Sequence, residues 1–306
     1  MSAHTLLRGP QWVVVRQHRA PLWMVFALLI AVAGTSAFLQ GWIAIGDTTP
    51  SGMARGGLSA FLLHSTTVSV VFPLLIGAFV AGPMVARELE SGTYKMLLTQ
   101  SVTATRWLAV RVALATAIAV ASSAVLVTTY RLTWAGTEGN GPAWYGSPYE
   151  TMGPIPVAYA VLGVGIGTLT GLLVRRTVPA MGAAAVATGA VHSTVYGLLR
   201  NHLWPVETVT GNPVPLPAAS SHPQILDMGG LTASGQRLDW DTCFARGSNP
   251  EACMVDRGAV TYYADTHPAS HAWPMQLVET GILLALTAAA VATAFWLLRR
   301  RYGAST

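Results

Sequence analysis

The chain has 306 residues, of which 52% are hydrophobic and only 10% are charged. Soluble globular domains carry about 25% charged residues, so this composition excludes an ordinary soluble protein and indicates a membrane protein. The net charge of +5 does not indicate a nucleic-acid partner. Such binding needs a basic patch on a fold of its own, and no segment of the sequence offers one.

Six segments are long and apolar enough to cross a bilayer, for which about 20 residues are needed. The first could be a signal peptide, since AGTSA follows an apolar run. However, the region before it is long for a signal peptide, and the apolar run continues to Ile45, so we expect a retained span. We predict an all-α membrane protein, forming one transmembrane domain over residues 1–306, with six helices at residues 22–45, 66–86, 107–129, 156–174, 178–199 and 274–298.

The basic residues cluster on one side of the membrane in this arrangement. Residues 1–21, 87–106, 175–177 and 299–306, together with Arg111 just inside the third span, hold 12 of the 18 basic residues but only two of the 13 acidic ones. Lys and Arg near span ends favour the cytoplasmic side. We therefore expect a multi-pass protein of the cell membrane with both termini in the cytoplasm.

Residues 200–273 form the longest expected outer loop, and they contain both cysteines. Cys243 and Cys253 flank the short stretch CFARGSNPEAC, which favours a disulfide in an oxidising compartment; two unpaired thiols are the alternative. A zinc site needs two more ligands, which are not evident, and Pro268 weakens a helical ligand pair of His267 and His271. We expect no metal site, and a partly folded extracytoplasmic cap, because a loop this long is usually functional or disordered.

Two other segments have a recognisable pattern. Residues 4–20 combine Trp12 and a run of valines with Arg16 and Arg19, which favours a short interfacial helix on the inner leaflet; a disordered leader is the alternative. In the fourth span, glycines recur every four residues at Gly163, Gly167 and Gly171. Small residues at this spacing let helices pack closely, and we predict that role for them.

The connector between the second and third spans, ARELESGTYKMLLTQ at residues 86–100, places two glutamates among basic residues. Apolar positions recur along it at helical spacing, which predicts a short amphipathic helix at the inner membrane surface; they are Leu89, Thr93, Met96 and Leu97. The alternative is an ordinary connector rich in basic residues. That reading accounts for Arg87, Lys95 and Arg106, but it does not require the glutamates.

RELESGT followed by LLTQSVTATRWLAVR resembles the connector between the second and third spans of ABC-2 type transporter permeases. The match is local, over residues 84–111, and the six spans, the N-terminal interfacial helix and the long outer loop extend the resemblance over the chain. PASHAWPMQLVETG, which leads into the sixth span, resembles actinobacterial members. The resemblance implies that the connector is a cytoplasmic coupling helix, which docks on a separate ATPase subunit.

The resemblance also implies which residues contact the ATPase. The positions that match the family motif are Arg87, Glu88, Glu90, Gly92 and Thr93. Glu88 and Glu90 are expected to meet basic or amide groups of the ATPase, and Gly92 to permit close backbone approach. The outer loop is long for a compact drug exporter, which leaves the transported substrate open.

The chain itself lacks the means to hydrolyse ATP by a P-loop. That motif requires G-x-x-x-x-G-K-[ST], and Lys95, the one lysine, lies in GTYKM. The chain is therefore expected to bind no cofactor and to be no enzyme, with ATP and Mg²⁺ held by the partner ATPase. Two ATPase subunits and two permease subunits are expected; a homodimer is the simpler assembly, and a related second permease is the alternative.

Polar residues within the spans are the remaining candidates for function. They lie near the outer ends of four spans, at Gln40, His64, His192 and Glu279. Ionisable groups within a membrane usually face a bundle interior or a cavity, so an outer polar layer that lines a pathway or gate is one interpretation. Structural pairing, for example of Glu279 with His192 or Arg200, is the other.

These features favour the membrane subunit of an ATP-driven transporter, most simply an exporter. A membrane sensor or immunity protein that binds a ligand through its outer loop is the main alternative, but it needs no coupling helix. A membrane-embedded hydrolase is less favoured, because H-E-x-x-H and G-x-S-x-G motifs are absent from the sequence.

Overall fold

The computed structural model describes residues 19–45, 50–94, 103–135, 147–212, 224–244 and 249–302. Within these ranges, six helical segments are long and apolar enough to cross a membrane, which confirms the predicted fold class. The long helices are α2 (Arg19–Ile45), α3 (Pro50–Leu75), α4 (Gly82–Ser91), α6 (Ala104–Ala135), α8 (Ile155–Val174), α9 (Thr177–Thr194) and α12 (Ala272–Tyr302).

The second span is built from three helical pieces rather than one. Pro73 lies inside α3, where it removes a backbone hydrogen-bond donor. The chain then continues as a short π-helix, η2 (Ile76–Ala81), and regains α-helical geometry in α4. The fifth span likewise ends in a π-helix, η3 (Val195–Leu199), followed by the 3₁₀ turn η4 (Arg200–His202).

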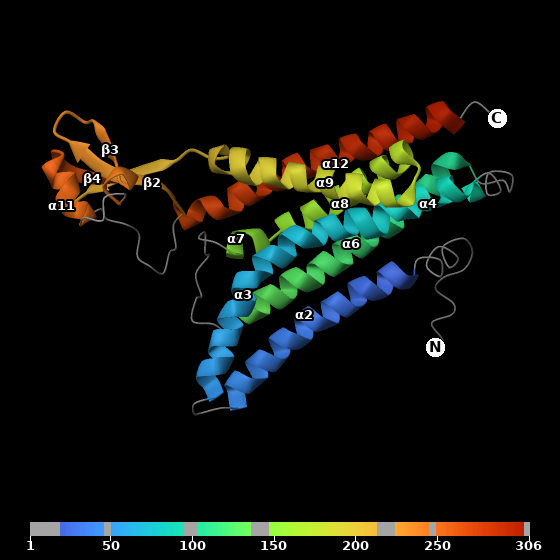
Figure 1. The fold of residues 1–306 in the computed structure, drawn as a ribbon, viewed down its shortest axis with the longest axis horizontal. Helices are drawn as coiled ribbons and strands as arrows, with labels where there is room; N and C mark the ends of the chain where they lie inside the picture. The colour runs from blue at the N-terminus through green and yellow to red at the C-terminus, as the bar shows by residue number, and fades with distance from the viewer. Residues whose placement is uncertain are drawn as a thin grey trace.

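Helix α8 lies in the middle of the bundle, between α12, α9, α6 and the second span (Figure 1). Three of its four glycines, Gly163, Gly167 and Gly171, face the second span at backbone distance. A Cβ atom on Gly163 would lie 2.5 Å from the carbonyl oxygen of Pro73, and one on Gly167 would lie 2.5 Å from that of Gly77. The prediction that the glycine stripe serves close helix packing is therefore confirmed.

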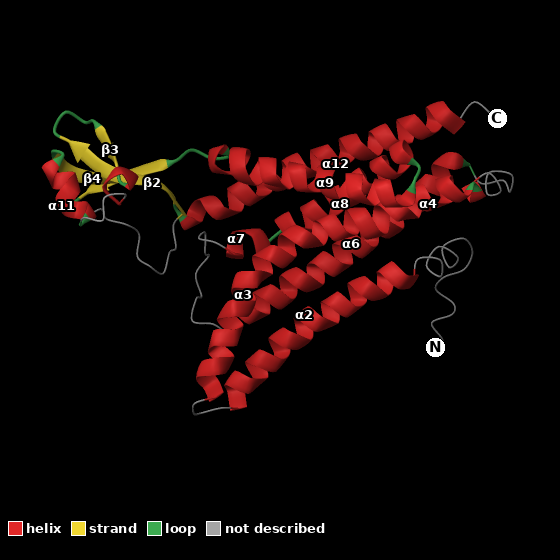
Figure 2. Ribbon diagram, viewed as in Figure 1, coloured by secondary structure: helices red, strands yellow, loops and turns green. Residues whose placement is uncertain are grey.

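The outer loop folds into a small cap that contains the strands of the structure (Figure 2). An antiparallel sheet of order β1-β4-β2-β3 is formed by β1 (Glu207–Gly211), β2 (Gln224–Thr232), β3 (Arg237–Asp239) and β4 (Ala259–His267). Two short helices, α10 (Asp241–Phe244) and α11 (Pro250–Asp256), are joined by the disulfide Cys243–Cys253. The predicted disulfide is confirmed, and the cap, whose fold the sequence did not determine, contains a small antiparallel sheet.

The cap and the predicted coupling segment lie at opposite ends of the bundle. The end that carries α4 is called the inner end below, and the end that carries the cap the outer end, after the orientation expected from the sequence. Helix α4, the beginning of α2 and the end of α12 lie at one end, and the sheet lies beyond the other (Figure 1). The sixth span reaches the cap through η6 (Ala269–His271). The predicted interfacial helix at residues 4–20 falls almost entirely outside the described residues, as do Lys95, Met96 and Leu97.

Candidate functional site

A buried ion pair joins the second and third spans at their inner ends. Glu88, on the last turns of α4, is only 8% exposed. One of its carboxylate oxygens accepts a hydrogen bond from the guanidinium of Arg111, and the other accepts one from Nε1 of Trp107 at 2.7 Å. Arg111 also donates to the carbonyl oxygen of Trp107 at 3.0 Å and lies over its ring. The charge of Glu88 is thus compensated within this chain.

The second glutamate of the motif binds the start of the fifth span. Oε2 of Glu90 accepts hydrogen bonds from the backbone nitrogen of Thr177 at 2.8 Å and from its hydroxyl at 2.5 Å. Thr177 is the first residue of α9. A helix N-terminus presents unpaired N–H groups and a positive dipole end, so the carboxylate of Glu90 caps α9 from a neighbouring helix.

The chain turns sharply directly after these glutamates. Helix α4 ends at Ser91, and Gly92 has a φ of 74°, in the left-handed region that favours glycine. A Cβ atom there would meet nothing within 4 Å. The backbone conformation of the turn therefore explains the glycine at position 92. The predicted amphipathic helix is not a separate element from residue 86 onward, because residues 86–91 are the inner end of the second span.

The predicted ATPase-contact residues do not all lie on the surface. Arg87, Glu90 and Thr93 are exposed, and Gly92 is half-buried. Glu88 points into the bundle and bonds to Arg111 and Trp107 instead. One further contact at this end was not predicted: Arg301 donates to the carbonyl oxygen of Leu172 at 3.0 Å, which ties the sixth span to the fourth.

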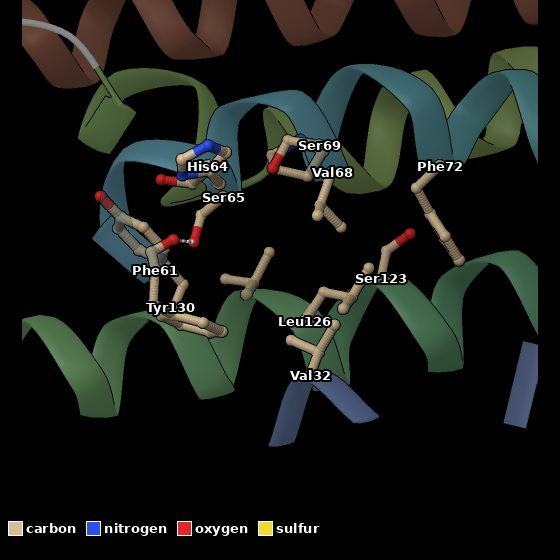
Figure 3. Close-up of a pocket in the computed structure, with 13 residues that line it drawn as sticks. Val32, Phe61, His64, Ser65, Val68, Ser69, Phe72, Ser123, Leu126 and Tyr130 are labelled. Carbon is tan, nitrogen blue, oxygen red and sulfur yellow. Dashed lines mark hydrogen bonds between the residues drawn. The ribbon is translucent and has the colours of Figure 1, made fainter. Parts of the chain in front are cut away.

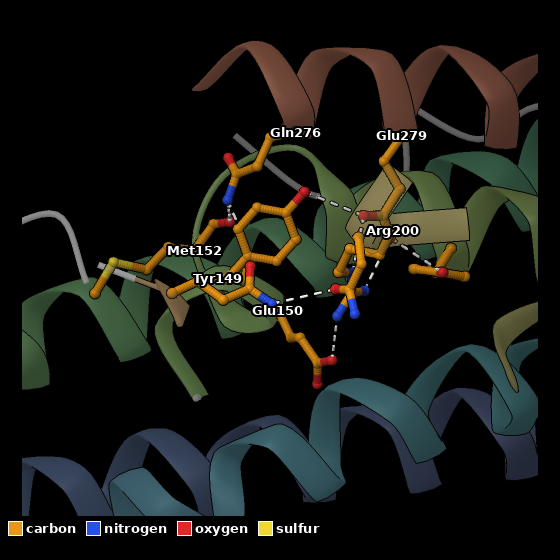
Figure 4. Close-up of polar contacts among 9 residues, drawn as sticks. Tyr149, Glu150, Met152, Arg200, Gln276 and Glu279 are labelled. Atoms are coloured by element: carbon orange, nitrogen blue, oxygen red, sulfur yellow. Dashed lines mark hydrogen bonds and ion pairs between the residues drawn. The ribbon is translucent and has the colours of Figure 1, made fainter. Parts of the chain in front are cut away.

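A second buried cluster lies at the outer end of the bundle, around Arg200 (Figure 4). Arg200 donates from Nε and Nη2 to the two carboxylate oxygens of Glu279, at 3.1 and 2.9 Å, and from Nη1 to Glu150 at 2.5 Å. The hydroxyls of Tyr149 and Tyr159 each donate to Glu279 at 3.2 Å. Glu279 is fully buried, and its two carboxylate oxygens accept hydrogen bonds from four donor atoms.

This cluster joins elements that are far apart in the sequence. Glu150 lies on α7 (Ser147–Thr151), Arg200 on η4 at the end of the fifth span, and Glu279 on the sixth span. Nε2 of Gln276 adds two bonds to backbone carbonyls of the α7 region, at 3.1 and 3.0 Å. The pairing of Glu279 with Arg200, one of the two interpretations from sequence, is confirmed.

The four polar residues predicted to form one outer layer are found in three places. The ring of His192 lies 4.8 Å from that of Tyr159 and so borders the Glu279 cluster. Gln40 donates to Ser36 at 2.9 Å, beside the hydrogen bond between Ser36 and Thr133 that joins α2 to α6. His64 is exposed and donates from Nδ1 to the carbonyl oxygen of Ala60 at 2.7 Å.

Hydrogen bonds also connect the cap to the bundle, through two histidines. Nε2 of His267, the last residue of β4, lies 3.4 Å from the carbonyl oxygen of Asn201, and its Nδ1 lies 3.3 Å from Nδ1 of His271. Nε2 of His271 lies 3.2 Å from Glu207 at the start of β1. Burial lowers the pKa of His267, with the neighbouring His271 charge acting in the same direction.

The order of donors along this series follows from the two end groups. A carbonyl oxygen only accepts, so His267 donates to Asn201 from Nε2 and accepts at Nδ1. The Nδ1 atom of His271 therefore donates to Nδ1 of His267. Among the described residues, no group of three or more His, Cys, Asp or Glu residues is placed to hold a metal ion.

On the outer face of the sheet, Arg237 bonds to Asp265 at 2.7 Å and covers the ring of Tyr263. Burial alone raises the pKa of Asp265, but hydrogen bonds from Arg237 and Thr208 outweigh it and lower the pKa below its ordinary value. Burial and the neighbouring Asp227 raise the pKa of Tyr263 to about 12. The polar atoms of these groups bond to one another, so they form an ion-paired surface and offer no candidate ligand site.

Residues 54–200 match the protein family described as ABC-2 membrane transporter related. The matched region begins in α3 and ends at Arg200, so it contains both glutamates of the inner motif, Arg111, Glu150 and the central helix α8. No curated protein and no solved structure matches the chain. The predicted resemblance to ABC-2 transporter membrane proteins is confirmed over this region.

Proposed function

We propose that the chain is the membrane-spanning permease subunit of an ATP-driven ABC transporter, an exporter powered by a separate cytoplasmic ATPase subunit. The observation that carries this proposal is the family match over residues 54–200, which includes the inner turn and its buried contacts. The six candidate spans are consistent with it. Membrane components of this family are not themselves ATPases, so ATP and Mg²⁺ belong to the partner.

The inner contacts suggest how a movement of the ATPase reaches the transmembrane helices. Segment 87–94 contains the end of α4 and the turn that follows it; its Glu88 pairs with Arg111, and its Glu90 bonds to the start of α9. A force on this segment therefore acts on the second, third and fifth spans together. In this proposal Arg87, Glu90 and Thr93 touch the ATPase, Gly92 forms the turn, and Glu88 transmits the movement from within.

The assembly follows from the chemistry of the partner. ATP sites of ABC ATPases work in pairs, so two ATPase subunits and two permease subunits are proposed, with a homodimer of this chain as the simplest form. Both termini and the inner turn face the cytoplasm, and the cap lies outside. The disulfide of the cap supports this orientation, because disulfides persist in oxidising compartments.

A membrane sensor or immunity protein is the second candidate, and the folded cap is the observation that favours it. A disulfide-bonded sheet at the outer end of six spans is a reasonable ligand-binding module. It does not explain why the two glutamates of the inner motif tie three spans around one turn. The transporter therefore accounts for more of the molecule.

Copurification with an ABC ATPase tests the proposal. The chain is co-expressed with the ABC ATPase encoded beside it, purified in detergent through a tag on this chain, and assayed for bound ATPase and for ATP hydrolysis. Stable association that is lost in Arg87→Ala/Glu90→Ala supports the transporter. A partly exposed ion pair in the cap, removed in Arg237→Ala/Asp265→Ala, is the control. No association with any ABC ATPase would contradict the proposal.

A further inference from the structure

A cavity of about 80 Å³ lies among α2, α3 and α6, apart from both polar clusters (Figure 3). The ends of α7 and α8 close one side of it. Its apolar lining includes Val32, Val68, Phe72, Leu126 and Val127. Its polar lining includes His64, Ser65, Ser69, Ser123, Tyr130 and Thr151. A largely apolar pocket with a few polar groups is the usual composition of a small-molecule site.

The polar groups of this cavity lie at two levels. His64, Tyr130 and Thr151 lie toward the outer end of the bundle, near the ends of their helices. Ser123 lies seven residues before Tyr130 on α6, which is about 10 Å deeper along the helix. Phe72 lies at the same deep level on α3, beside Ser123 (Figure 3). Between the two levels, the cavity is lined by Val68, Leu126 and Val127 together with Ser65 and Ser69, and the hydroxyl of Ser65 already donates to the carbonyl oxygen of Phe61 at 2.7 Å.

The hydroxyl of Ser123 points to a missing ligand at the deep level. Ser123 is 1% exposed, and its hydroxyl has no hydrogen-bond partner. The neighbouring Ser122 behaves as serines in spanning helices usually do, donating to the carbonyl oxygens of Ile118 and Ala119. The buried hydroxyls of Thr188 and Thr280 also lack a partner, but neither lines this cavity. Buried polar groups normally have a partner, and here the open side is the cavity.

The size and shape restrict what fits. The cavity has a volume of about 80 Å³, and its lining extends about 10 Å along α6, so its shape suits a single narrow alkyl segment rather than a ring. An ordinary phospholipid chain presents no polar atom about 10 Å below its head group. A chain with a hydroxyl or carbonyl group at mid-length does.

We propose that this cavity binds an amphipathic alkyl molecule with two polar groups about 10 Å apart. One polar group lies at the outer level beside His64, Tyr130 and Thr151, and a hydroxyl or carbonyl group bonds to Ser123 at the deep level. The source is either a free amphiphile or a membrane lipid that carries such a chain. The site does not depend on the proposed transport function, because a sensor could use it equally.

Photolabelling of the full chain in nanodiscs of dimyristoylphosphatidylcholine tests this site. The probe is a diazirine analogue of 10-hydroxyoctadecanoic acid, and labelled residues are located by peptide mass spectrometry. We expect labels on residues 61–72 and 123–130. Unlabelled 10-hydroxyoctadecanoic acid should displace the probe at about 2- to 12-fold lower concentration than octadecanoic acid, as one hydrogen bond predicts. Phosphatidylcholine carrying the 10-hydroxy chain, added in a parallel arm, distinguishes a lipid from a free amphiphile.

Matched variants separate the site from general partition into the bilayer. Ser123→Ala should abolish the preference for the hydroxylated acid, whereas Thr188→Ala, an equally buried hydroxyl without a partner, should keep it. Leu126→Trp fills the cavity and should abolish labelling, whereas Val186→Trp, on the exposed face of α9, should not. Equal displacement by both acids in the wild-type chain overturns the proposal, as does labelling that Leu126→Trp leaves unchanged. A cavity that holds water only would give the same negative result.

Discussion

Glu88 and Arg111 form a buried ion pair between the inner ends of the second and third spans, although 23 residues separate them in the sequence. The ion pair therefore holds the two spans together at the ends that the turn connects. Any protein that binds this turn moves both helices together, which is what an ATPase that drives a transporter needs to achieve.

Glu88→Ala should destabilise the protein by about 3–5 kcal/mol, because it leaves the charge of Arg111 buried without its partner. Thermal unfolding in detergent, followed by tryptophan fluorescence, measures the loss. The double variant Glu88→Ala/Arg111→Leu should recover part of it, since no unpaired charge remains. An additive double variant, with no recovery, would show that the two residues are not coupled.

Arg200→Met should have a comparably large effect at the outer end, again about 3–5 kcal/mol, because Glu150 and Glu279 both lose their cation in a buried place. Arg200→Lys should restore only part of the stability, since lysine cannot donate to both oxygens of Glu279 in the same plane. Arg237→Ala is the control, because its half-exposed pair with Asp265 contributes about 0–1 kcal/mol. Equal losses for Arg200→Met and Arg237→Ala would contradict the description of the Arg200 cluster.

Removal of the disulfide should loosen the cap without affecting the spans. The Cys243–Cys253 bridge closes a loop with a sequence separation of 10, for which chain entropy predicts about 2–3 kcal/mol. In Cys243→Ser/Cys253→Ser, hydrogen exchange should become faster in β2, β3 and α11 and remain unchanged in α8. Exchange that accelerates equally in α8, or in neither region, would be inconsistent with a separately folded cap.

The junction between cap and bundle should weaken as the pH falls. The folded state lowers the pKa of His267, so below the ordinary histidine value of about 6.5 the unfolded cap takes up a proton that the folded cap does not. Its stability is therefore full above that pH and falls as the pH approaches the lower, folded value. Protonation of Asp265, whose pKa is also lowered, reduces the stability of the cap only below about pH 4.

The protection factors of β1 and β4 against hydrogen exchange at pH 7.5 and 5.5, which correct for the intrinsic pH dependence of exchange, measure this effect. His267→Gln should remove most of the difference between the two values, while His202→Gln, at an exposed position nearby, should not. The groups that face His267 are His271, through it Glu207, and the backbone of Asn201. If the protection factors at the two pH values are the same in the wild-type chain, His267 does not control the junction.

The spans could be predicted from the sequence because length and apolar composition determine them almost independently of context. Their ends could not. Helix α6 runs to Ala135, six residues beyond the predicted end, since Tyr130 and Thr133 are polar in type but buried against neighbouring elements. The sequence was enough to predict that the glycines of α8 serve close helix packing. It was not enough to predict the π-helix η2 on the facing span, because this depends on where Pro73 packs against Gly163.

The clusters depend on contacts between distant parts of the chain, and the sequence indicates these only weakly. Arg111 inside a span was a signal that a buried acid should lie nearby, yet nothing local selects Glu88 over Glu90. Glu150 gave no signal, because it lies in an outer loop of ordinary composition. The sheet of the cap was missed for the same reason. Strands β2 and β4 pair although they are far apart in the sequence, and β2 contains the adjacent glycines Gly229 and Gly230, which are untypical of a strand.

The central claim is that the turn after α4 binds a cytoplasmic ATPase, and a single thiol tests it most directly. Both natural cysteines are joined in the cap, so Thr93→Cys, at an exposed position of the turn, provides the one free thiol of the chain. A benzophenone maleimide on this thiol should crosslink to the co-expressed ABC ATPase in inverted membrane vesicles, more strongly with ATP than without it. Thr210→Cys, exposed on β1 of the cap, should give no such product and should react with an impermeant maleimide in intact cells. A Thr93→Cys protein that reacts from outside intact cells, or that never crosslinks to the ATPase, would contradict the account.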